Sequence, residues 1–138
     1  MSLFNVFNVT GSAMSAESVR LNTTSSNLAN ANSVSSSAEE TYKARHPIFA
    51  AELNKFTGQQ GSSVPVRVEG IVESQKPLRA EYNPEHPMAN AEGYIFKPNV
   101  NVMEEMANMI SASRSYQTNV EVAEASKQML MRTLQMGK

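Results

Sequence analysis

The stretch that decides the fold is VMEEMANMISASRSYQTNVEVAEASKQMLMRTLQM, residues 102–136. Neither glycine nor proline interrupts it, and apolar side chains recur along it at alternating spacings of four and three residues. Asn101 precedes it as an N-cap with Glu104 three residues later, in the pattern of a capping box, and Gly137 follows as a stop signal. We therefore predict one helix, roughly 50 Å long at 1.5 Å per residue. The apolar seam along this helix contains Val102, Met106, Met109, Tyr116, Val120, Leu130 and Leu134.

A helix of this length needs a partner along its seam, because most helical stability in proteins comes from tertiary packing. The N-terminal segment is the first candidate, since Phe7, Met14, Leu21 and Leu28 are spaced by seven residues with small residues between them. Its stretch LNTTSSNLANANS, residues 21–33, is rich in Asn, Ser and Thr, which have poor helix propensity. We predict a weak helix that becomes stable only when packed; the alternative is a disordered polar tail.

The middle of the chain has the pattern of short strands and turns. One strand is expected within residues 41–53, and a second, with a bulge near Gly70, within residues 64–74. Residues 57–63 and 75–94 are expected to be loops, and a last short strand is expected within 93–100. Two or three such strands are too few to be stable alone, so this region needs support from the helices.

The predicted fold is therefore mainly α: N- and C-terminal helices paired as an elongated coiled coil, with a small β-hairpin-like middle region. The expected domain boundaries are residues 1–34 for the N-terminal helix, 35–98 for the middle region and 99–138 for the C-terminal helix.

The composition excludes several classes of function. No cysteine is present for thiol catalysis or zinc binding, and a net charge of −1 does not favour nucleic acid or an anionic membrane. The N-terminus lacks the basic start and continuous apolar core of a cleaved signal peptide. One alternative is a metal or acid–base cluster of His86 with Glu81 and Glu85, but a packed loop histidine explains the pattern more simply. We expect no enzyme activity, catalytic residue, cofactor or metal.

Motifs at both ends of the chain are similar to a known family. The motifs are SVRLNTTSSNLANANS (18–33), PNVNVMEEMANMISASRSYQTNVEV (98–122), EGYIFKPNVNV (92–102) and YNPEHPMANA (82–91). With them the chain resembles the bacterial flagellar basal-body rod proteins, a family of axial proteins, and within it the proximal rod proteins designated C. The polar residues that match the family signature are Asn27, Asn30, Asn32, Asn99, Asn101 and Gln117.

The resemblance implies a structural subunit of the proximal rod. Such subunits assemble helically into a hollow axle that transmits motor torque across the periplasm for motility and forms part of the export channel. The resemblance also implies export through the flagellar type III apparatus without a cleaved signal peptide. The implied partners are other proximal rod proteins and copies of the chain, the distal rod protein above, export-gate and base junction proteins below, and the surrounding periplasmic ring.

One alternative of a different class stays open at this point, namely a soluble helical adaptor or a module resembling an export chaperone. Such a module would form a discrete dimer that is stably folded at low concentration.

Overall fold

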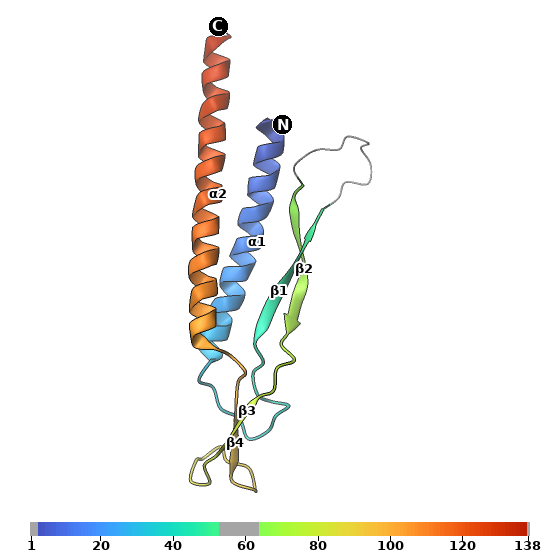
Figure 1. Ribbon diagram of the computed structural model, residues 1–138, viewed down its shortest axis with the longest axis vertical. Helices are drawn as coiled ribbons and strands as arrows, with labels where there is room; N and C mark the ends of the chain where they lie inside the picture. The colour runs from blue at the N-terminus through green and yellow to red at the C-terminus, as the bar shows by residue number, and fades with distance from the viewer. Residues whose placement is uncertain (1–2, 53–63, 138) are drawn as a thin grey trace.

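The computed structural model describes residues 3–52 and 64–137, which form two long helices and four short strands (Figure 1). In chain order the elements are α1 (Leu3–Asn30), β1 (Arg45–Ala51), β2 (Val66–Glu73), β3 (Arg79–Tyr82), β4 (Tyr94–Lys97) and α2 (Val102–Met136). The expected mainly α fold with a small antiparallel middle region is confirmed.

The two helices lie side by side and run in opposite directions, with α1 between α2 and the β1–β2 hairpin (Figure 1). α2 extends beyond the start of α1, while β3 and β4 project from the opposite end of the molecule (Figure 1). The helix pairing therefore has the expected partners. Supercoiled packing of the two helices and the domain boundaries given above stay predictions.

Several polar side chains of α1 bond to the helix's own backbone, and packing against α2 and the β1–β2 hairpin supports the helix. The hydroxyls of Thr10 and Thr23 donate to the carbonyls of Val6 and Val19, each at 2.8 Å. Further along, Asn30 donates through Nδ2 to a carbonyl four residues back, at 2.9 Å. These bonds satisfy polar groups that would otherwise compete with the helix for hydrogen bonds. Segment 21–30 is thus helix and not a disordered tail.

The caps of α2 follow the sequence closely. Asn101 is the N-cap in an extended conformation, and its side chain accepts a hydrogen bond from the Met103 N–H at 3.2 Å. The returning half of the expected capping box does not form: the Glu104 carboxylate instead lies 3.7 Å from Lys76 Nζ. Gly137 ends the helix with φ −91°, so its backbone does not require glycine there.

The β1–β2 hairpin contains the expected bulge. The antiparallel register runs from Arg45 opposite Glu73 to Ala51 opposite Val66. It shifts between Ile48, which faces Gly70, and Phe49, which faces Val68, so Glu69 has no opposite residue.

The second hairpin corrects one prediction. The sequence predicts a loop at residues 75–94, yet they contain β3, which pairs with β4 from Arg79 opposite Lys97 to Tyr82 opposite Tyr94. The middle region therefore has four strands in two separate sheets, rather than two or three strands. The loop expected at 57–63 lies outside the described residues.

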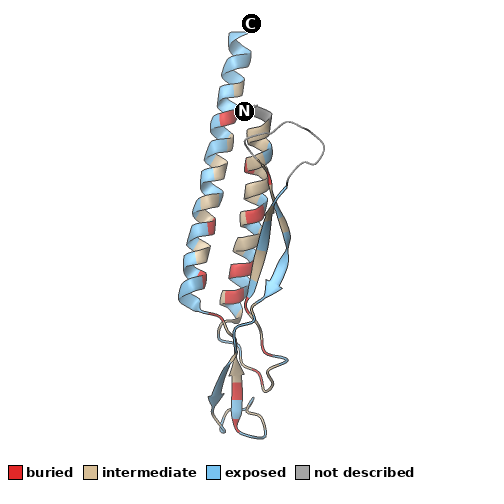
Figure 2. Cartoon of the chain, turned by 45° about the vertical axis from the view of Figure 1, so that its right-hand side comes forward, coloured by how far each residue is buried: buried red, intermediate tan, exposed pale blue. Residues whose placement is uncertain are grey.

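Few of the described residues are buried, and they are spread thinly along the molecule (Figure 2); large apolar side chains are few among them. The largest fully buried side chains are those of Ile95, Asn27 and Pro98. Threonines of α1 and small residues of α2, among them Ala112 and Ser126, make up much of the rest. Small side chains on the buried line of α2 leave room for a neighbouring helix to approach closely.

Candidate functional site

Asn27 of α1 has the most completely bonded side chain among the described residues. Its side chain is fully buried. Oδ1 accepts hydrogen bonds from the Arg45 N–H at 2.9 Å and the Tyr42 hydroxyl at 2.8 Å. Nδ2 donates to the Arg45 carbonyl at 2.8 Å and to Glu105 Oε2 at 3.1 Å. One amide therefore connects α1, α2 and the start of β1.

Asn99 makes the corresponding connection from the segment that leads into α2. Its Oδ1 accepts a hydrogen bond from the Ala44 N–H at 2.8 Å. Its Nδ2 donates to the carbonyls of Lys76 at 2.7 Å and Ser74 at 3.4 Å. The Ser74 N–H in turn donates to the Ala44 carbonyl at 2.7 Å, which extends the β1–β2 ladder by one bond.

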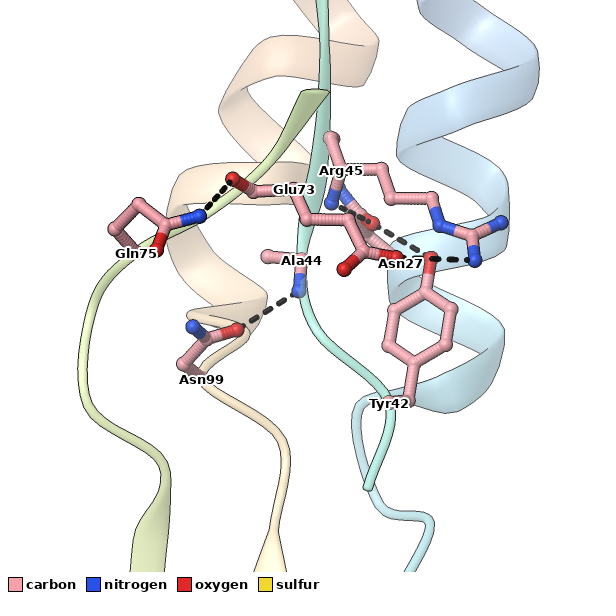
Figure 3. Close-up of polar contacts among 7 residues, drawn as sticks. All are labelled: Asn27, Tyr42, Ala44, Arg45, Glu73, Gln75 and Asn99. Carbon is pink, nitrogen blue, oxygen red and sulfur yellow. Dashed lines mark hydrogen bonds and ion pairs between the residues drawn. The ribbon is translucent and has the colours of Figure 1, made fainter. Parts of the chain in front are cut away.

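The two asparagines hydrogen-bond to adjacent residues of one backbone segment, as Figure 3 shows. Ala44 and Arg45 lie at the point where the connection from α1 enters β1, and their main-chain groups bond to Asn99 and Asn27 respectively. A side-chain amide presents a donor and an acceptor together, so Asn27 can pair with Arg45 as a neighbouring strand would. We call this set the junction: Asn27, Tyr42, Ala44, Arg45, Asn99 and Glu105.

The guanidinium of Arg45 has an aromatic ring and a carboxylate as neighbours. It lies 5.6 Å from the centre of the Tyr42 ring and 3.4 Å from a carboxylate oxygen of Glu73. Burial raises the pKa of the Tyr42 hydroxyl; the Arg45 charge opposes this shift, and the carboxylates of Glu105 and Glu73 add to it. The hydroxyl is therefore held in the neutral form that can donate to Asn27.

Sequence reasoning missed three of the junction residues that matter most: Tyr42, Arg45 and Glu105. Glu105 is explained by its place in the first turn of α2, where a carboxylate interacts favourably with the helix dipole. The structure adds that Glu105 is only 3% exposed and is bonded to Asn27. The sequence carries no signal for this burial, because only the structure places Glu105 on the same buried line as Ala112.

The apolar seam expected on α2 lies partly on its outer surface. The buried line of α2 passes Glu105, Ala112 and Ser126. The predicted positions Met106 and Leu134 are 48% and 63% exposed, because Met106 follows the buried line by one residue and Leu134 lies where α2 extends past α1. The other seam residues are Val102 and Tyr116, which are exposed, and Met109, Val120, Leu130, Phe7, Met14, Leu21 and Leu28, which are half-buried.

The remaining signature residues lie at several places. Asn30 closes the last turn of α1 through its bond to Ser26, and Asn101 caps α2. Asn32 and Gln117 are exposed on the surface. Only Asn27 and Asn99 of this group therefore belong to the junction.

The proposed metal cluster does not form. Among the described residues no group of three or more metal-ligating side chains comes together, and Glu81 forms an ion pair with Lys97. His86 Nδ1 accepts a hydrogen bond from the Met88 N–H at 3.1 Å, which is a local loop contact. Within residues 3–52 and 64–137, neither helix combines the length and hydropathy that a bilayer crossing requires.

Both ends of the chain match known protein families. A family model described as "Flagella basal body rod protein" matches residues 7–35, and one described as "Flagellar basal body rod FlgEFG protein C-terminal" matches residues 91–136. These two matches contain α1 and α2 almost completely, together with Asn27 and Asn99.

Individual relatives extend the likeness through the middle region. The chain is 44% identical to the flagellar basal-body rod protein FlgC of Salmonella typhimurium over 137 residues, which cover 99% of both chains. It is 45% identical to FlgC of Yersinia enterocolitica over 139 residues, again 99% of both. It is 35% identical to FlgC of Bacillus subtilis over 150 residues, 100% of both. From helices, hairpins and relatives together, the chain belongs to the FlgC family of flagellar basal-body rod proteins.

Proposed function

We propose that α1 and α2 pair as a coiled coil in the inner wall of the proximal rod and that the outer face of α2 packs against neighbouring subunits. As a FlgC family member, the chain is a structural subunit of the flagellar basal-body rod and not an enzyme, and it assembles with other rod proteins.

The observation that carries the proposal is the reversed distribution of large and small side chains on α2. Its buried line contains Glu105, Ala112 and Ser126, whereas Met106 is 48% and Ile110 is 54% exposed. Exposed apolar side chains that gather in a patch mark interaction surfaces, because water disfavours them. The residues that share this exposure on α2 are Val102, Met103, Met106, Ile110, Tyr116, Val122, Met129, Met131, Leu134 and Met136.

The experiment introduces a charge on the outer face without disturbing the junction. Met106→Asp should abolish rod assembly and swimming, since an unpaired carboxylate would be buried between subunits. Thr118→Asp is the matched control, because Thr118 is exposed on the same helix and is already polar. Immunoblots of the subunit and counts of isolated basal bodies separate loss of assembly from loss of protein. Normal swimming of the Met106→Asp strain would exclude packing through this face.

We further propose the placement and partners that the family resemblance implies. The subunit reaches the periplasm unfolded through the type III export apparatus and then lines the export channel. It contacts other proximal rod proteins and copies of itself, the distal rod protein above, the export-gate and base junction proteins below, and the periplasmic ring around it. The low helix propensity of the Asn-, Ser- and Thr-rich stretch in α1 supports this route, because a helix that depends on packing unfolds readily before export.

A further inference from the structure

The β3–β4 hairpin and its loop form an ordered tip with an exposed aromatic surface. The rings of Tyr82 and Tyr94 meet edge to face with centroids 5.2 Å apart, and their side chains are 64% and 40% exposed. Met88, on the loop between them, is 45% exposed. This loop is held by its own hydrogen bonds: Asn90 Oδ1 accepts from the N–H groups of Glu92 at 3.0 Å and Tyr94 at 2.9 Å.

The tip also carries negative charge that no described residue neutralises. Glu85 and Glu92 are exposed, and neither forms an ion pair within the described ranges. Glu81, at the base of the tip, is by contrast paired with Lys97. An aromatic surface beside two free carboxylates fits a partner that offers cations together with polarizable apolar groups.

A surface of the required chemistry lies at the opposite end of the molecule. The part of α2 from Lys127 to Met136 contains no acidic residue. Met131 and Leu134 are 51% and 63% exposed there, and a surface hollow of about 390 Å³ is lined by Glu124, Lys127, Gln128, Met131 and Arg132. This end of α2 extends past α1 and lies far from the tip, so the two surfaces cannot meet within one chain (Figure 1).

We propose that the β3–β4 tip docks onto the basic, methionine-lined end of a C-terminal helix in the next rod subunit, an end of the kind that α2 itself presents. The Tyr82 and Tyr94 rings contact the thioether and cationic side chains, and Glu85 and Glu92 pair with lysine or arginine on the flank of that helix. Because the two complementary surfaces lie at opposite ends, the contact is head-to-tail and can repeat along an axis. The proposal rests on the rod role given above and assigns the tip its partner.

Photo-crosslinking in assembled basal bodies tests this contact. A photoreactive phenylalanine analogue replaces Ala91, an exposed loop residue of the full-length chain. We expect mass spectrometry to find the adduct on the last three turns of a rod subunit's C-terminal helix. An adduct on any other segment, on a non-rod protein, or no adduct from assembled basal bodies would overturn the proposal. The same analogue at exposed Ala29 of α1 is the control and should give a different adduct.

A charge reversal separates specific docking from simple proximity. The double change Glu85→Lys and Glu92→Lys should lower the adduct yield about tenfold, since like charges then face each other. Glu39→Lys with Glu40→Lys alters the net charge equally at exposed positions outside the tip and should leave the yield unchanged. Equal yields from both double variants would contradict the charge pairing. Normal numbers of basal bodies with the adduct elsewhere would refute tip docking and leave the rod role intact.

Discussion

Asn27 and Asn99, which are 72 positions apart in the sequence, bond to the consecutive residues Arg45 and Ala44. The N-terminal helix, the entry to the C-terminal helix and the first strand are therefore fixed to one another at a single point. Each amide uses both its donor and its acceptor on main-chain groups, and Asn27 adds bonds to the side chains of Tyr42 and Glu105.

The change Asn27→Ala should destabilise the chain by about 2–4 kcal/mol, because four hydrogen bonds are lost and buried Glu105 loses a partner. Urea unfolding followed by circular dichroism measures this loss. The protein concentration is chosen so that a further increase does not raise the helical signal per residue. Asn22→Ala on the exposed face of the same helix is the control and should cost less than ~0.5 kcal/mol. Equal losses for the two variants would show that the junction does not stabilise the fold.

Alkaline pH should weaken the junction through Tyr42. Its pKa is raised in the folded chain, mainly by burial, so folding favours the neutral hydroxyl. The contribution of this group is therefore fully present below its unfolded pKa of about 10 and is lost as the pH rises through the higher folded pKa.

Tyr42→Phe isolates this effect from other groups that titrate at high pH. Stability measured between pH 8 and about 11 should fall less steeply in this variant than in the unchanged chain. Tyr116→Phe, at an exposed tyrosine, should follow the unchanged chain. If all three profiles have the same slope, the Tyr42 hydroxyl does not couple to folding.

Gly93→Ala should disorder the tip. Gly93 has φ +82°, and an added Cβ would lie 2.8 Å from Cε2 of Tyr82 and 3.2 Å from Cβ of Pro84. Left-handed strain and this contact together should cost about 2–3 kcal/mol locally. Gly70→Ala is the control, since no atom lies within 4 Å of its added Cβ. Protease cleavage within residues 83–93 should rise in the first variant only.

Ala112→Leu should push the helices apart. Ala112 has 0% exposure on the buried line of α2, so three added carbon atoms have no space and should cost about 1–3 kcal/mol. Ala107→Leu, on the exposed side of α2, adds the same atoms where they meet solvent. A lower urea midpoint for Ala112→Leu alone is expected; an unchanged midpoint would show that the helices do not approach closely there.

The sequence predicts the helices well because their signals are local. Uninterrupted 4–3 spacing, the Asn101 cap and the glycine stop identify α2 nearly to the residue. The same spacing does not tell which line faces inward, because here many large apolar side chains are exposed while Ala112 and Ser126 lie inside. Periodicity records where apolar residues are, and in a subunit of an assembly these positions need not face its own interior.

The middle region was harder to predict because its order depends on distant contacts. β3 has no alternating apolar pattern and lies between Pro77 and Pro84, so only its pairing with β4 makes it a strand. The junction likewise depends on contacts between residues that are distant in the sequence. Resemblance singled out Asn27 and Asn99, but no spacing connects them to Ala44 and Arg45.

The exposed methionines of α2 affect how closely this helix can fit neighbours of different shape. Five of the chain's nine methionines are exposed there, and a thioether side chain is unbranched and easily reshaped. Methionine side chains can adapt to surroundings that differ from one copy to the next, whereas branched side chains pack well in only one arrangement. One sequence can thus occupy positions of unequal shape around a shaft without a separate variant for each.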